Sequence, residues 1–219
     1  MNLDINSISI YAQQFGSLII AVLGLVVFSK RENPILILGF YGVNSVFFEV
    51  VNELTNFRSN IVGDLYTLAE ALILLYFFYT LFSSLWSKKF IISIGILYCV
   101  LYFVLMLGDW QVTHSAIRML RDLILIVCSI LYFYFLMTNM PTTTITGYSM
   151  FWIVAAFIFF FAGTFVLSLS LDYLMNVLND DMFYLWTARN YFRFFFCLVV
   201  SYGLWLDLRL VKVNLRIQP

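Results

Sequence analysis

Charged side chains lie inside long apolar stretches of this sequence, and the deepest two are Glu70 and Arg193, which have opposite charge. A charged group at the centre of a membrane span costs roughly 2.5–3.5 kcal/mol on insertion scales. Such residues therefore usually face other helices and mark ion pairs, ligand sites or ion pathways. Counted along their apolar segments, both lie at a similar depth, and we expect them to form a buried ion pair. If the pairing shifts by one turn, the substitute partners are Asp64, Arg121, Asp172 and Arg189.

Other polar side chains accompany this pair at helical spacing. Arg189, Asn190 and Arg193 share one stripe of the last apolar segment, and Tyr66 and Glu70 share one stripe of the third. The candidate ligand-binding residues are Glu49, Asp64, Tyr66, Glu70, Arg121, Asp122, Asp172, Arg189, Asn190 and Arg193.

Three kinds of chemistry fit this set of residues. The first is a pocket for a small polar or amphipathic ligand, and the second is a structural ion-pair network that locks helices together. The third is an intramembrane reaction that uses Glu70 with Asp64 or Asp172. We favour the ligand pocket, because charges inside a membrane usually serve a function.

The sequence lacks the residues that several other kinds of site require. His114 is the single histidine and lies in a predicted loop, so a multi-histidine zinc site is not expected. The last apolar segment has no lysine for a retinal Schiff base, and the chain has no HExxH, GxSxG or glycine-rich phosphate loop. Cys99, Cys128 and Cys197 all lie in apolar runs and are interpreted as small core residues. We expect no cofactor, no bound metal and no catalytic residue.

The composition of the chain predicts that lipid surrounds these residues. Hydrophobic residues make up 63% of the 219 positions and charged residues 11%, whereas an average soluble domain carries about 25% charged residues. Such a chain has too few polar side chains to form the surface of a soluble protein. The net charge is zero and no basic tract is present, which argues against nucleic acid as a partner.

Seven apolar segments are long enough to span a bilayer, for which roughly 20 residues are needed. The predicted fold is therefore an all-α transmembrane bundle in a single domain, 1–219, with a basic tail at 207–219. The predicted spans are 12–28, 35–51, 61–85, 90–107, 117–137, 150–174 and 185–206. With these boundaries Glu49, Arg121, Asp122 and Asp172 lie nearer the interface than Glu70 and Arg193. The fourth span adds little polarity and is expected at the periphery.

The basic residues of the loops predict the orientation of the bundle, because Lys and Arg accumulate on the cytoplasmic side. With the N-terminus outside, the outer segments hold only Arg58 and Arg118. The inner segments then hold Lys30, Arg31, Lys88, Lys89, Arg209, Lys212 and Arg216. We therefore expect a multi-pass protein of the inner (plasma) membrane with its C-terminus inside, and a polar cluster in the outer half.

Short motifs resemble a group of bacterial proteins. Tyr66-Thr67-Leu68-Ala69-Glu70, Phe151-Trp152-Ile153, and Leu185-Trp186 with Asn190 are similar to segments of short seven-span bacterial membrane proteins of unassigned function. Related helical bundles form the membrane sensor portions of signalling kinases. The resemblance implies a seven-span sensor-like bundle but no particular activity.

The sequence therefore favours a sensor or receptor-like subunit that binds a small ligand from the outer side. A tail of about a dozen residues offers no output domain, so signalling would need a cytoplasmic partner. A transporter or transporter subunit is the alternative, although no internal repeat or pair of broken helices marks such a site. The carboxylate-dependent enzyme is the third interpretation.

The topology can be tested with reporter fusions. We expect a reporter that is active only in the cytoplasm to be active when it is fused after Pro219, because the loop charges place this end inside. Activity of a periplasm-specific reporter at the same position would reverse the orientation.

Overall fold

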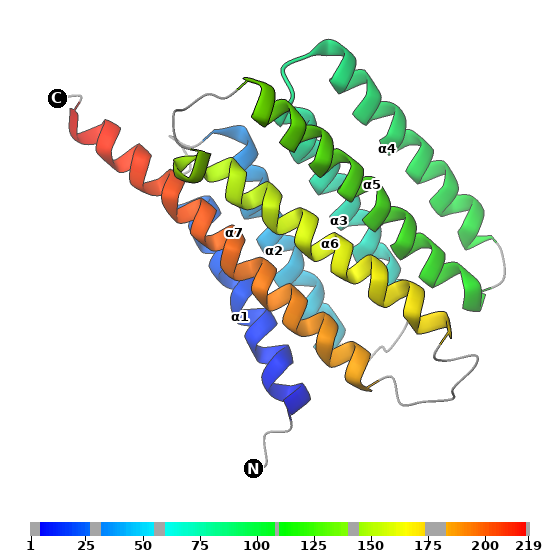
Figure 1. Cartoon of the computed structure of the whole chain (residues 1–219). Coiled ribbons are helices and arrows are strands. Elements are labelled where there is room, and N and C mark those ends of the chain that lie inside the picture. The colour runs from blue at the N-terminus through cyan, green and yellow to red at the C-terminus, as the bar shows by residue number, and fades with distance from the viewer. Residues whose placement is uncertain are drawn as a thin grey trace.

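The structure is a computed structural model, and it describes residues 5–26, 32–54, 60–107, 110–139, 145–173 and 183–217. Side chains are described from 8 to 210, apart from 27–31, 52–61, 108–115, 140–144, 171–184 and 186. The described residues form seven α-helices and one short 3-10 helix (Figure 1). These are α1 (Ile5–Leu25), α2 (Asn33–Leu54), α3 (Asn60–Leu81), α4 (Leu85–Met106), α5 (Trp110–Asn139), η2 (Ile145–Gly147), α6 (Ser149–Tyr173) and α7 (Phe183–Ile217).

All seven α-helices are long and apolar enough to cross a membrane. The predicted all-α bundle of seven spans is therefore confirmed. The helices have 21 to 35 residues, which corresponds to roughly 30–50 Å at 1.5 Å per residue. Pro34 is the second residue of α2, where its missing N–H and fixed φ do not interrupt helical hydrogen bonding.

The connection between α3 and α4 differs from the prediction. The third span was expected to end at Leu85, but α3 ends at Leu81 and Leu85 is the first residue of α4. The chain turns at Ser84, which has an extended backbone (φ −70°, ψ 133°). Lys88 and Lys89 therefore belong to the first turns of α4 and not to a loop. Lysines can occupy such positions because their long side chains reach toward water.

Two further helices are longer than the hydropathy of the sequence indicates. α5 begins at Trp110, seven residues before the expected start of the span at Ile117. α7 continues to Ile217, so most of the predicted 207–219 tail belongs to the last helix. In Figure 1 the end of α7 extends past the neighbouring helices. Hydropathy detects the lipid-buried part of a helix, whereas helical hydrogen bonding continues into polar sequence.

Six helices form a closed ring in which each contacts the next, in the order α1, α2, α3, α5, α6 and α7, with α7 returning to α1. α4 lies outside the ring against α3 and α5 (Figure 1). Only 17% of its span is buried, compared with 44% for the spans of α2, α3 and α6. The predicted peripheral position of the fourth span agrees with this arrangement.

Small residues allow α1, α2 and α7 to approach closely. A Cβ atom on Gly42 would lie 2.5 Å from the backbone nitrogen of Ala21, and one on Gly24 would lie 2.5 Å from Cα of Gly39. A Cβ atom on Gly16 of α1 would lie 2.6 Å from Cβ of Cys197 in α7. Such contacts are a common basis of helix association in lipid, where burial of apolar surface gives little driving force.

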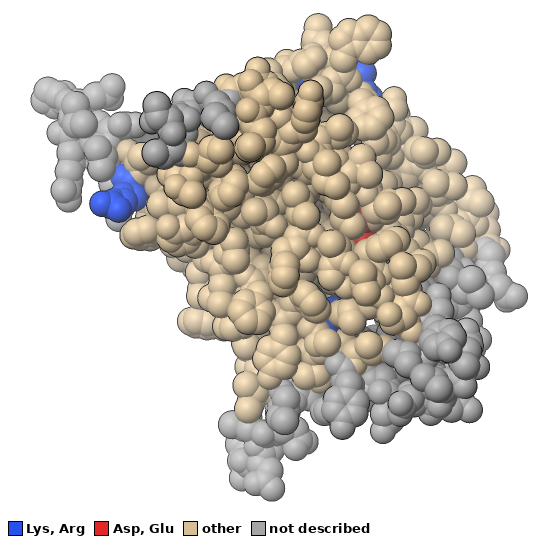
Figure 2. Space-filling view, in the orientation of Figure 1, with Lys and Arg blue, Asp and Glu red and all other residues tan. Residues whose placement is uncertain are grey.

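Aromatic side chains fill the centre of the ring. Phe157 of α6 packs on Phe77 and Phe78 of α3 and stacks on Phe196 of α7, with ring centroids 5.4–5.9 Å apart. Tyr41 of α2 meets Phe196 edge to face at 6.1 Å. Many large apolar side chains are exposed on the outer surface, and the face in Figure 2 shows only small blue and red areas of charged residues. Polar groups buried in the ring therefore have to find their partners there.

The glycine contacts give a first prediction about stability. Replacing Gly42 with Ala should lower the free energy of unfolding by about 1–3 kcal/mol, because the added methyl group forces α1 and α2 apart. Gly63→Ala is the matched control, since nothing lies within 4 Å of its added Cβ. Thermal unfolding in detergent micelles measures both. Equal midpoints for the two variants would contradict the close crossing.

Candidate functional site

The polar cluster lies at one level of the ring. Glu70, Arg121 and Arg193 are ten, eleven and ten residues from the first residues of α3, α5 and α7. This corresponds to roughly 15 Å along each helix. The three helices begin at the same end of the bundle (Figure 1). Matched depth on three helices thus brings one acid and two bases together inside the ring.

The centre of the cluster is an ion pair between Glu70 and Arg121. Arg121 Nη1 donates a short hydrogen bond to Glu70 Oε2. The neighbouring acid, Asp122, accepts from the same guanidinium at 2.8 Å (Nε) and 2.6 Å (Nη2). These three side chains are at most 1% exposed, and the Arg121 guanidinium lies 5.6 Å from the ring centre of Phe161. The arginine is therefore compensated on two sides and covered by an aromatic face.

Arg193 reaches Glu70 through an intermediate hydroxyl, and the expected direct pair is wrong. Arg193 Nη2 donates to the Tyr66 hydroxyl, which donates to Glu70 Oε1 at 2.9 Å. Arg121 is the residue that pairs directly with Glu70, because α5 starts earlier than its hydropathy indicates. Arg121 and Asp122 were expected near the interface, but both are buried. The additional seven residues move Arg121 roughly 10 Å deeper, to the level of Glu70.

Glu70 has a full set of partners. Its Oε1 accepts from the hydroxyls of Tyr66 and Tyr41, both at 2.9 Å, and its Oε2 accepts from Arg121. Tyr41 was not among the candidate residues. It precedes Ser45 and Glu49 by one and two turns on the same face of α2, and this spacing could have found it. A carboxylate held by three donors is suited to anchoring helices and not to accepting a proton.

A second branch of hydrogen bonds runs from Arg193 to α1 and α2. Arg193 Nη2 donates to the Ser45 hydroxyl at 2.6 Å, and Ser45 donates to Ser17 at 3.1 Å. Gln13 of α1 donates to Glu49 of α2 at 3.3 Å. The network therefore connects α1, α2, α3, α5 and α7, which are five of the six helices of the ring.

The remaining candidate residues lie at the margin of this network or beyond it. Asn190 is buried and donates to Ser9 of α1 at 3.1 Å, and Asp64 is also buried. Glu49, Tyr66 and Arg189 are half-buried. The side chain of Asp172 falls outside the described residues, as does His114. The cluster thus has an enclosed centre and a half-exposed margin, here defined as Gln13, Glu49, Tyr66 and Arg189.

Arg189 differs from the other arginines of the cluster. Its side chain lies one turn before Arg193 and close enough to Arg118, Arg121, Arg193 and Asp122 to interact with their charges. Within the described part of the chain, its guanidinium makes no hydrogen bond or ion pair. Of the four described charged side chains that act on it most strongly, three are cations.

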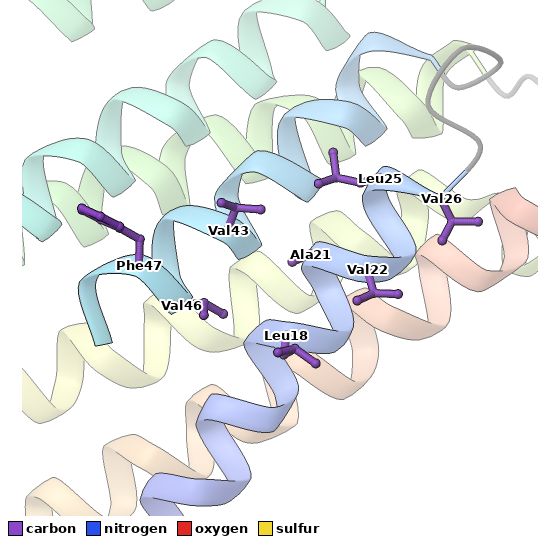
Figure 3. Close-up of a pocket in the computed structure, with 8 residues that line it drawn as sticks. All are labelled: Leu18, Ala21, Val22, Leu25, Val26, Val43, Val46 and Phe47. Atoms are coloured by element: carbon purple, nitrogen blue, oxygen red, sulfur yellow. The ribbon is translucent and has the colours of Figure 1, made fainter. Parts of the chain in front are cut away.

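A separate groove of about 610 Å³ lies between α1 and α2 (Figure 3). Only apolar side chains line it, namely Leu18, Ala21, Val22, Leu25, Val26, Val43, Val46 and Phe47. Several of these are exposed on the lipid-facing surface. This groove has no polar group to orient a ligand, so it is not the candidate site. No group of three or more potential metal ligands occurs among the described residues.

Comparison of the chain with protein-family models, curated proteins and solved structures finds no match. The class of protein is therefore defined by the fold alone: an integral membrane protein with seven spanning helices.

The buried ion pair gives a prediction about coupling. Arg121→Gln should lower the free energy of unfolding by about 3–5 kcal/mol, because it leaves the buried Glu70 and Asp122 without their counter-charge. Glu70→Gln should lower it by less, because Arg121 keeps Asp122 as a partner. The double variant should lose clearly less than the sum of the singles. Tyr41→Phe is the control, since it removes one hydrogen bond to the Glu70 carboxylate but no charge, and interhelical hydrogen bonds in membrane proteins are worth about 0.6–1.7 kcal/mol.

Unfolding in mixed micelles with increasing SDS measures all four variants. Additive losses, with no coupling between positions 70 and 121, would contradict the ion pair.

Proposed function

We propose that this protein is a sensor or receptor-like subunit that binds a small polar or amphipathic ligand inside the helix ring. The observation that carries the proposal is the half-exposed margin of the polar network. Gln13, Glu49 and Tyr66 present donors and acceptors at the end of the ring where α3, α5 and α7 begin. Ligand sites typically combine an apolar wall with a few polar groups of fixed position.

The enclosed centre supports binding over catalysis. Glu70 and Arg121 are fully buried and saturate each other, so neither is available as a base or as a proton donor. A rigid centre of this kind can hold the margin residues in place, as supporting residues do in preorganised sites. Tyr66 links the two parts, because it is half-buried and bonded to both Glu70 and Arg193.

The distribution of basic residues supports a ligand that arrives from outside. Lys88, Lys89 and Arg209 lie near the start of α4 and in the last part of α7, at the end of the bundle opposite the polar cluster (Figure 1). By the positive-inside rule that end faces the cytoplasm of an inner-membrane protein. α7 extends past its neighbours there and could present a surface to a cytoplasmic signalling partner.

Native mass spectrometry tests the proposal. The protein, extracted into nanodiscs from its host membrane, should carry a small-molecule adduct. Glu49→Leu should lose this adduct, because the substitution removes a margin carboxylate and the acceptor of Gln13. Phe47→Leu, on the lipid-facing groove of the same helix, is the control and should keep it.

Thermal unfolding of both variants accompanies the experiment, so that loss of ligand is not confused with loss of fold. If the wild type carries no adduct, or if a folded Glu49→Leu protein keeps it, the polar margin is not a ligand site.

A further inference from the structure

Among the described residues of the cluster, Arg189 is the arginine that has no bonded acid or hydroxyl. It is half-buried within the spanning part of α7, yet it makes no hydrogen bond or ion pair within the described residues. The nearby acid, Asp122, already receives two hydrogen bonds from Arg121 on one carboxylate oxygen. Besides Asp122, the described charges that act most strongly on Arg189 belong to Arg118, Arg121 and Arg193.

A second arginine on the same face of α7 also has an unused donor. Arg193 follows Arg189 by four residues and is therefore one turn deeper on the same face. Its Nη2 is bonded to Ser45 and Tyr66, which are both neutral. Its Nε is buried and has no hydrogen-bond partner among the described residues. One face of α7 thus presents two guanidinium groups with donors to spare.

Elementary electrostatics favours an anion at this position. Like charges repel more strongly at the low dielectric of a membrane interior, and an arginine there normally has a counter-charge. Guanidinium has planar, paired N–H donors that match the two oxygens of a carboxylate or a phosphate. A bound anion would offset the repulsion between Arg189 and Arg193 and accept hydrogen bonds from their unused N–H groups.

We infer that Arg189 binds the negatively charged group of the ligand, a carboxylate or a phosphate. This inference rests on the proposed function and gives the chemical class of the ligand. The anion has two potential sources, a water-soluble small molecule or the phosphate of a lipid headgroup. Both would meet the same guanidinium at the margin of the ring.

Thermal unfolding of the full chain in the presence of defined anions tests the inference. In one arm, inorganic phosphate or succinate is added to protein in neutral detergent, with chloride at equal ionic strength as the reference. In the other arm, nanodiscs of phosphatidylcholine are compared with nanodiscs that also contain phosphatidylglycerol. A rise in the unfolding midpoint in the first arm identifies a soluble anion, and a rise in the second identifies a headgroup.

Arg189→Gln is the decisive variant, because Arg189 makes no contact that holds the described fold together. Without anion it should unfold at or above the wild-type midpoint, since one of several like charges is gone. Its apparent affinity for the stabilising anion should fall by at least about tenfold, the loss expected for a charged hydrogen bond. Arg189→Lys should keep part of the effect, and Arg209→Gln, at the opposite end of α7, should keep all of it.

Three results would overturn the inference. The wild type is stabilised in neither arm, or Arg189→Gln responds to the anion as the wild type does, or Arg189→Gln without anion is as unstable as Arg121→Gln. In each case the proposed function is judged separately by the adduct. A neutral adduct that Arg189→Gln retains would keep the ligand site and remove only its anionic character.

Discussion

The ion pair between Glu70 and Arg121 is the interaction on which the arrangement of the ring depends. Both side chains are almost completely buried at the same depth of neighbouring spans. Neither charge could stay there alone, because an isolated charge in such surroundings is strongly unfavourable. The pair therefore fixes the axial register of α3 against α5. The hydroxyls of Tyr41 and Tyr66 extend this constraint to α2 and, through Arg193, to α7.

Packing on the rest of the ring is compatible with this register because it is made of small and aromatic residues. Gly24, Gly39 and Gly42 let the backbones of α1 and α2 touch, which keeps Gln13 and Ser17 within reach of Glu49 and Ser45. Beside the polar level, Phe157 and Phe196 close the centre of the ring with stacked faces. This aromatic packing excludes water from the side of the polar network that faces the centre of the ring.

The sequence predicted the number and type of the helices, the peripheral fourth span and the polar side chains that meet. Those features follow from hydropathy and from the cost of buried charge, which act on each segment separately. The direct partner of Glu70, Arg121, was predicted only as a substitute for Arg193, because its depth depends on where α5 starts. His114 and Ser115 end the apolar run, although the helix begins at Trp110. Arg121 was therefore predicted too close to the interface, and Arg193 was predicted as the partner of Glu70 instead. Tyr41 was not predicted as part of the polar cluster, because a tyrosine within an apolar run is normally interpreted as a core residue.

The contrast between Arg193 and Arg189 shows how the same residue type can take two roles on one helix face. Arg193 lies at the level of Glu70 and is held by Ser45 and Tyr66. Arg189 lies one turn earlier, where the charged side chains that act on it most strongly are three arginines and one acid, Asp122. Within the described residues, removal of this second arginine would reduce repulsion and break no hydrogen bond, so the ion-pair network does not need it. The proposed ligand site rests on this difference, because Arg189 lies at the margin and is joined to the buried centre through α7.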